Sequence, residues 1–189
     1  MTELSLHILD LVRNALEAGA SRVEIVVDED AATDTLRLEV KDNGRGMSQE
    51  EIDRVLDPFY TTRKTRHVGL GLPLLQEACQ RCEGELSIRS RPGRGTTVQA
   101  LFKRSHIDRA PLGDMPSVLL TILFSEKPVD WLYVHRIDGR EFRLDTAEVR
   151  KETAEVPLTH PRVRQWLLEY LRKGEQDLGS TDIPLRAIA

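Results

Sequence analysis

The segment from Asp42 to Met47, Asp-Asn-Gly-Arg-Gly-Met, has residue types that could hold a flat ligand. A carboxylate can accept a hydrogen bond from an amino group, and glycines beside it let the bare backbone approach a ring closely. The segment directly follows a predicted strand. The same residues are also typical of a hairpin turn, so the segment by itself leaves both interpretations open.

A second pair of glycines and a run of cations have the character of a phosphate site. Gly69-Leu70-Gly71 opens a predicted helix, where free backbone N–H groups and the positive end of the dipole favour anions. No acid occurs from Tyr60 to Leu75, and the loop before the glycines carries four groups that suit a cationic lid over a triphosphate: Arg63, Lys64, Arg66 and His67. A solvated run of charge is the alternative interpretation.

Four polar side chains near the N-terminus fall on one stripe of a predicted helix. His7, Asp10, Asn14 and Glu17 follow one another at intervals of 3, 4 and 3 residues, which places them within about 80° on a helical wheel. An amphipathic helix always presents some polar face to water. The spacing is therefore compatible with a site and with a plain surface.

Apolar periodicity predicts the elements that must position these residues. Ser48 and Glu51 have the spacing of a capping box, which opens a short helix. The expected helices lie at residues 3–18, 48–56 and 72–82, and the expected strands at 23–27, 36–40, 86–90 and 96–102.

The chain after about residue 105 predicts a second, smaller unit. The polar stretch from Ser105 to Gly113 suggests a boundary, so we expect one domain at 1–104 and another at 105–189. Asp138-Gly139 lies between two strand-like runs and is a strong hairpin signal. An amphipathic helix is expected from Val163 to Leu171, with Pro161 at its start and Gly174 just past its end.

In this order the segments resemble the ATP-binding boxes of the GHKL superfamily, which comprises gyrase, the ninety-kilodalton heat-shock chaperone, histidine kinases and MutL. The resemblance implies the Bergerat fold, an α+β two-layer sandwich with helices on one face of a mixed, largely antiparallel sheet. It covers about residues 1–104. The segments that carry it are 10–20 for the N box, 42–47 for the first glycine box, 57–63 for the F box, 69–72 for the second glycine box and 93–98 for the last.

The resemblance implies how adenine would be held. Asp42 would accept a hydrogen bond from the adenine amino group, and Thr96 or Thr97 would support the same ring edge. Gly44 and Gly46 would make room for the base.

It also implies how Mg²⁺ and the phosphates would be held. Asn14 would ligate Mg²⁺ through its side-chain oxygen, a hard ligand suited to an ion that also bridges phosphates. The phosphates would contact the second glycine segment and the lid cations, namely Gly69, Leu70, Gly71, Arg63 and Lys64.

Asp10 lies one helical turn before Asn14, where gyrase-like and MutL-like ATPases carry a glutamate that activates water. An aspartate is one methylene shorter than a glutamate, so we expect slow hydrolysis. His7, another turn earlier, is similar to the histidine that pairs with the acid in the pyruvate-dehydrogenase-kinase type. It either tunes Asp10 or is a plain surface or packing histidine.

Other positions depart from the histidine-kinase pattern. Glu17 replaces the usual lysine, His67-Val68 replaces the usual Gly-Thr, and the lid is short. Few residues precede Asn14, so we expect no upstream helix with a phosphoacceptor histidine. The resemblance therefore favours a stand-alone histidine-kinase-like ATP-binding protein.

Composition argues against several classes of partner and cellular location. The net charge is -4, with 27 Lys+Arg against 31 Asp+Glu, which argues against a nucleic-acid surface. The sequence lacks a signal peptide or an apolar run long enough to cross a bilayer, and its 2 cysteines make no disulfide framework. We expect a cytoplasmic protein without a membrane or nucleic-acid partner.

The expected function is that of a Mg-ATP-binding regulatory protein, with ATP/ADP as its small-molecule partner. Such a protein would transfer phosphate to a partner protein or hydrolyse ATP slowly as a conformational switch, and GHKL relatives often form homodimers. The alternative is a catalytically degenerate Bergerat scaffold that acts as an interaction module. A third reading, a redox or metal site at Cys79 and Cys82, is disfavoured because two thiols cannot close a tetrahedral zinc site.

Overall fold

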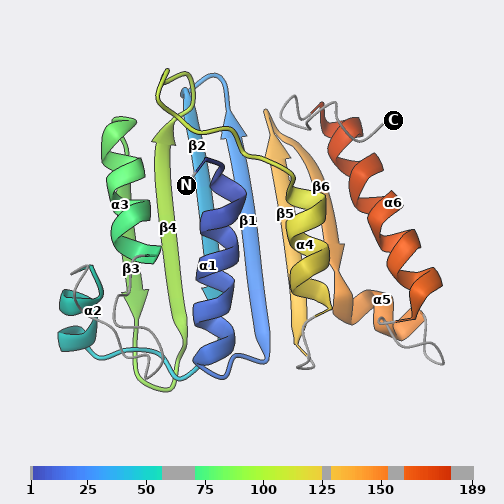
Figure 1. Cartoon of the computed structure of the whole chain (residues 1–189), viewed down its shortest axis with the longest axis horizontal. Helices are drawn as coiled ribbons and strands as arrows, with labels where there is room; N and C mark the ends of the chain where they lie inside the picture. The colour runs from blue at the N-terminus through green and yellow to red at the C-terminus, as the bar shows by residue number, and fades with distance from the viewer. Residues whose placement is uncertain (1, 57–70, 125–128, 153–159, 180–189) are drawn as a thin grey trace.

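The computed structural model describes residues 2–56, 71–124, 129–152 and 160–179. It has one six-stranded sheet in the order β3-β4-β2-β1-β5-β6, and helices α1, α3, α4 and α6 lie on one face of that sheet (Figure 1). All neighbouring strands are antiparallel except β1 and β5, which are parallel. The predicted two-layer α+β sandwich with a mixed sheet is confirmed.

The first half of the chain supplies the centre of the sheet and the helices that cover it. Burial alternates along β1 and β2, so each strand has one apolar face for the helices to cover. In β1, Val23, Ile25 and Val27 face the helices, and the residues between them face away. The predicted capping box is present, with Glu51 N–H donating to Ser48 Oγ at 3.3 Å and Ser48 N–H to Glu51 Oε2 at 2.8 Å. The elements are α1 (Leu4–Glu17), β1 (Arg22–Asp30), β2 (Thr35–Asp42), α2 (Gln49–Val55), α3 (Gly71–Arg81), β3 (Glu85–Ser90) and β4 (Thr96–Lys103).

The second half extends the same sheet. Its elements are α4 (Met115–Leu123), β5 (Asp130–Ile137), β6 (Arg140–Asp145), α5 (Thr146–Glu152) and α6 (Pro161–Leu178). The predicted hairpin is confirmed, because β5 and β6 pair antiparallel around Asp138 and Gly139, both at positive φ. One apolar core runs through both halves, from Leu4 of α1 to Leu171 of α6. The division after residue 104 stays a prediction.

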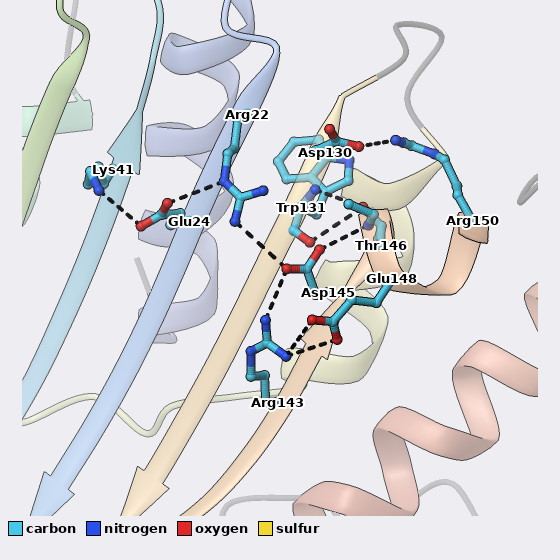
Figure 2. Close-up of polar contacts among 11 residues, drawn as sticks. Arg22, Glu24, Lys41, Asp130, Trp131, Arg143, Asp145, Thr146, Glu148 and Arg150 are labelled. Atoms are coloured by element: carbon cyan, nitrogen blue, oxygen red, sulfur yellow. Dashed lines mark hydrogen bonds and ion pairs between the residues drawn. The ribbon is translucent and has the colours of Figure 1, made fainter. Parts of the chain in front are cut away.

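Polar contacts on the helix-free face also join the two halves (Figure 2). Arg22 of β1 contacts Glu24 at 3.3 Å and reaches across β5 to Asp145 of β6 at 3.7 Å. Arg143 contacts the same Asp145 carboxylate at 3.1 Å. These partly exposed pairs each contribute little free energy, but they show that β6 and β1 share one charged surface.

The N-terminus of α1 is held by the chain that leads into α4. The first free backbone donors of a helix need partners, and here Leu4 N–H and Ser5 N–H donate to the carbonyls of Pro111 and Leu112 at 2.9 and 2.8 Å. The helix that carries Asp10 and Asn14 is thus fixed at its start by the second half of the chain.

The predicted end of the last helix was wrong. Helix α6 continues through Gly174 to Leu178, and Gly179 ends it in the left-handed conformation with φ 79°. Gly174 lies where the helix touches strand β6, since an added Cβ would be 2.2 Å from Cε2 of Phe142. The glycine serves close packing rather than termination.

No helix within the described ranges is long and apolar enough to span a membrane.

Candidate functional site

Asp42 ends β2 and lies directly opposite Thr96, the first residue of β4. Cross-strand partners share a face of the sheet, and this pair lies on the side that the helices cover. Asp42 Oδ1 accepts a hydrogen bond from Gly44 N–H at 2.7 Å. Its partial burial raises the pKa of the carboxyl, while hydrogen bonds from the backbone of Gly44 and Thr96 act in the opposite direction. The arrangement leaves a half-buried carboxylate at the end of the sheet.

The structure distinguishes the two candidate threonines. Thr97 pairs with Lys41, whose side chain lies on the opposite, helix-free face because side chains alternate along a strand. Of the two, only Thr96 shares a face with Asp42.

Ser90, at the end of β3, was not among the predicted site residues. Its hydroxyl lies 2.9 Å from Thr96 Oγ1, donates to the Gly95 carbonyl at 2.8 Å and accepts from Met47 N–H at 2.8 Å. Ser90 thus joins the glycine-rich segment after β2 to the turn between β3 and β4. A serine at a predicted strand end carries no sequence signal for this role.

The glycines at 44 and 46 allow the protein's own backbone to pack closely. A Cβ at Gly44 would lie 2.9 Å from the Cβ and the carbonyl oxygen of Ala18, and at Gly46, with φ 66°, it would lie 2.0 Å from the Arg91 carbonyl oxygen. Arg45 N–H donates to Ala18 O at 2.9 Å. The segment is therefore clamped between the end of α1 and the β3–β4 turn.

Asp10 of α1 lies beside the first residue of α3. A Cβ at Gly71 would be 3.6 Å from Asp10 Oδ2, so the carboxylate and the N-terminus of α3 border the same space. The Asp10 side chain is 37% exposed and lies 3.9 Å from Arg13. The predicted stripe on α1 and the predicted phosphate-binding helix end are brought together.

His7 is buried, which excludes the interpretation as a surface histidine. Its side chain belongs to a residue only 4% exposed, and Nδ1 has no hydrogen-bond partner among the described residues. Burial lowers the pKa of the imidazole, the charge of the N-terminus lowers it further, and Asp10 acts in the opposite direction. At neutral pH the ring is therefore uncharged, and packing and tuning of Asp10 both remain open.

Asn14 lies one turn after Asp10 and is half-buried. An amide oxygen and a neighbouring carboxylate are the hard donors that Mg²⁺ accepts, together with water and phosphate oxygens. Within the described ranges, no three His, Cys, Asp or Glu side chains gather to hold a metal. The donor types of Asn14 and Asp10 fit Mg²⁺.

Four predicted phosphate contacts lie outside the described residues, namely Arg63, Lys64, Gly69 and Leu70, as does the predicted F box.

Cys79 and Cys82 have the character of core residues. They are 0% and 2% exposed. Burial is the main cause that raises the pKa of the Cys79 thiol to about 12. Since the thiolate is the reactive form, neither metal nor redox chemistry is favoured there.

Comparison with known families agrees with this geometry. The family described as histidine kinase-, DNA gyrase B-, and HSP90-like ATPase matches residues 2–106. That range contains α1, the segment after β2, the start of α3 and the β3–β4 turn.

Two curated relatives are sensor or sporulation kinases. The sensor protein kinase FleS of Pseudomonas aeruginosa is 44% identical over 105 residues, which are 56% of this chain and 25% of that protein. Sporulation kinase C of Bacillus subtilis is 31% identical over 94 residues, 50% of this chain and 22% of that protein. The matched part thus spans a quarter or less of either relative.

A solved structure shares the fold. The crystal structure of the N-terminal domain of a DNA repair protein superposes with a TM-score of 0.53 at 17% identity, over 77% of this chain and 53% of that one. This likeness supports the Bergerat fold alone. With more than half of its residues matched by one family, the chain belongs to the histidine kinase-, DNA gyrase B- and HSP90-like ATPases.

Proposed function

We propose that this protein binds Mg-ATP between the ends of β2 and β4 and the N-terminus of α3, and that it acts as a regulatory protein in signal transduction. The observation that carries the proposal is the half-buried Asp42 carboxylate beside Thr96, hydrogen-bonded to Gly44. A carboxylate is an acceptor only, so it selects a base that presents an amino group on the edge facing it. Adenine carries an amino group at C6, where guanine carries a carbonyl.

Each remaining group has a part in the proposed site. Asn14 and the phosphates would hold Mg²⁺, which supplies charge stabilisation to the phosphoryl group. The first turn of α3 offers backbone N–H groups to phosphate. Asp10, beside Gly71, is the candidate general base, and His7 is the residue that would tune it from the preceding turn.

Thermal unfolding with nucleotides tests the binding step. Mg-ATP or Mg-ADP at 100 times its Kd should stabilise the wild type by about 2.7 kcal/mol, whereas Mg-GTP should give a much smaller shift. Asp42→Asn should lose the adenine-selective shift. Glu39→Gln is the matched control, because Glu39 lies on the helix-free face of the same strand, and it should respond as the wild type does.

The fate of the γ-phosphate separates the two forms of the proposal. Phosphotransfer predicts that label from γ-labelled ATP appears on a partner protein. A hydrolytic switch predicts slow release of phosphate that is lost in Asp10→Asn while the Mg-ATP shift in unfolding temperature remains.

A degenerate scaffold is the second candidate. Asp10 favours it, since it is a short acid that already contacts Arg13 at 3.9 Å. A wild-type protein that shows no unfolding shift with any nucleotide at millimolar concentration would select this candidate. A double variant, Asn14→Ala with Asp42→Asn, that keeps all partner binding without nucleotide would do the same.

The proposal includes a cytoplasmic location and a protein partner, and a homodimer is the expected assembly. Sedimentation equilibrium with and without Mg-ATP measures that assembly directly.

A further inference from the structure

Far along the sheet from Asp42, four charged side chains of alternating sign form a chain between the core and α6. Arg104, just after β4, contacts Glu29 of β1 at 3.2 Å, and Glu29 lies 3.4 Å from His135 Nε2. On the other side of the ring, His135 Nδ1 lies 2.7 Å from Glu175 Oε2 of α6. Strands β1 and β5 are thereby joined to a helix that follows them by many residues.

The two members of this charged series nearest α6, His135 and Glu175, are fully buried. They are 0% and 1% exposed, and the Tyr133 hydroxyl donates to the second Glu175 oxygen at 2.8 Å. Glu175 directly follows Gly174, where α6 touches Phe142. The helix thus packs closely against β6 beside the residue that carries its buried carboxylate.

An ionised Glu29 and an ionised Glu175 can both accept a hydrogen bond from His135 only when each ring nitrogen carries a proton. Carboxylates are acceptors, and a neutral imidazole has a single N–H, yet both nitrogens of His135 face a carboxylate oxygen. With an imidazolium, the charges of Arg104, Glu29, His135 and Glu175 sum to zero. Without that proton the four charges sum to -1, and the buried Glu175 carboxylate keeps neutral donors alone, the remaining N–H of His135 and the Tyr133 hydroxyl, which is costly.

Among the described residues, the elements packed against α6 bring few further charged groups to this point. Helix α4, which packs against α6, is Met-Pro-Ser-Val-Leu-Leu-Thr-Ile-Leu and has no titratable side chain. Arg140 of β6 lies near Gly179, at the end of α6. Burial by itself lowers the pKa of His135, but the hydrogen bonds with Glu175 and Glu29 raise it to about 9.

We propose that His135 and Glu175 form a proton-dependent latch, in which the imidazolium holds α6 on the sheet and loss of its proton releases α6 while the sheet stays folded. Helix α6 contributes no backbone hydrogen bond to the β-ladder, and among the described residues its polar attachment elsewhere to the strands is Tyr170 Oη to the Arg143 carbonyl at 3.3 Å. Apart from the latch, α6 is therefore held mainly by apolar packing, as at the fully buried Leu167 and Leu171. Release would uncover Leu167, Leu171 and the ring of Phe142.

The direction of the pH effect follows from the raised pKa. The docked state binds the proton more tightly than the released state, whose histidine has the ordinary value of 6.5. Docking is therefore strongest below that value and weakens about tenfold per pH unit up to about 9, on the order of a hundredfold in all.

Hydrogen exchange of the full chain from pH 6 to pH 10, corrected for intrinsic rates, tests the latch. Protection of α6 should fall on the order of a hundredfold while β2 and β4 keep theirs. Glu175→Gln, a neutral isostere, should hold α6 with little pH dependence. Glu141→Gln is the matched control. Glu141 of β6 is an exposed partner of Arg136 of β5, and this variant should behave as the wild type does.

Nitrogen-15 spectra of the histidine rings give a second readout that does not depend on the variants. His135 should have two protonated ring nitrogens at neutral pH and should titrate far above 6.5. A midpoint near 6.5, α6 protection that is constant to pH 10, or loss of protection in α6 and β2 in one step would each overturn the latch. None of these outcomes depends on nucleotide binding.

Discussion

Asp42 and Thr96 face each other across β2 and β4, and the carboxylate of Asp42 is kept half-buried by the segment that follows it. Burial raises the pKa of this carboxyl, so the fold disfavours the ionised form of the group that would recognise adenine. Ionisation of Asp42 is therefore expected to strengthen nucleotide binding and to lower the stability of the nucleotide-free protein.

The first prediction concerns pH. Affinity for Mg-ATP should be full well above the raised pKa of Asp42 and should fall on acidification at a higher pH than the ordinary aspartate value of 3.8 would give, because a protonated carboxyl is a poorer acceptor. Calorimetric titrations across the acid range measure this. Mg-ITP, which carries a carbonyl in place of the amino group, should bind weakly at neutral pH, where an ionised carboxylate can only accept.

The stability of the nucleotide-free protein should respond in the opposite sense. The folded state binds the Asp42 proton more tightly than the unfolded state, so the ionised carboxyl costs stability at neutral pH and that cost disappears as pH falls through the raised pKa. Asp42→Asn should therefore be as stable as the wild type or more stable in urea without nucleotide. A large destabilisation would contradict this account.

The second prediction concerns the clamped glycine segment. Gly46→Ala should destabilise the fold by about 2–4 kcal/mol, because a Cβ there would meet the Arg91 carbonyl oxygen at 2.0 Å and the residue has φ 66°. Gly93→Ala is the matched control, with φ 72° but nothing within 4 Å, and it should cost about 1 kcal/mol. Equal losses of unfolding free energy in the two variants, measured in urea, would show that the positive φ alone, and not the contact with Arg91, determines the cost.

The third prediction concerns Ser90. Ser90→Ala should cost about 1–2 kcal/mol, since it removes the donor to Gly95 O and the acceptor for Met47 N–H. It should also weaken Mg-ATP binding, because the Thr96 hydroxyl loses the Ser90 hydroxyl that lies 2.9 Å from it. Ser87→Ala changes the other face of the same strand and should leave nucleotide affinity unchanged.

The fourth prediction concerns Gly174. Alanine favours a helix interior by about 1 kcal/mol over glycine, but at this position its Cβ would lie 2.2 Å from the ring of Phe142. Gly174→Ala should therefore destabilise the protein by about 1–3 kcal/mol, measured by urea unfolding. Adding Phe142→Leu should recover part of that loss, whereas a gain in stability from Gly174→Ala alone would refute the close contact.

The outline of the candidate site follows from the sequence because its parts are local motifs. The stripe of Asp10 and Asn14 depends on helical spacing, and the segment after Asp42 depends on turn chemistry. The choice between Thr96 and Thr97 depends on the register of β2 with β4, which sequence spacing does not state. The burial of His7 depends likewise on what packs over α1.

By itself, the sequence determined the helices and strands of the first half and the Asp138-Gly139 hairpin, because apolar periodicity and turn residues act over a few neighbouring positions. The family followed from the resemblance of its ordered motifs to the ATP-binding boxes of known proteins. The tertiary structure decided that β5 lies parallel to β1 and so extends one sheet. It also placed Gly174 inside a helix against Phe142, and Glu175 against His135. These contacts join residues far apart in the chain, and they form because burying apolar surface brings the two halves onto one core, a condition that no local pattern encodes.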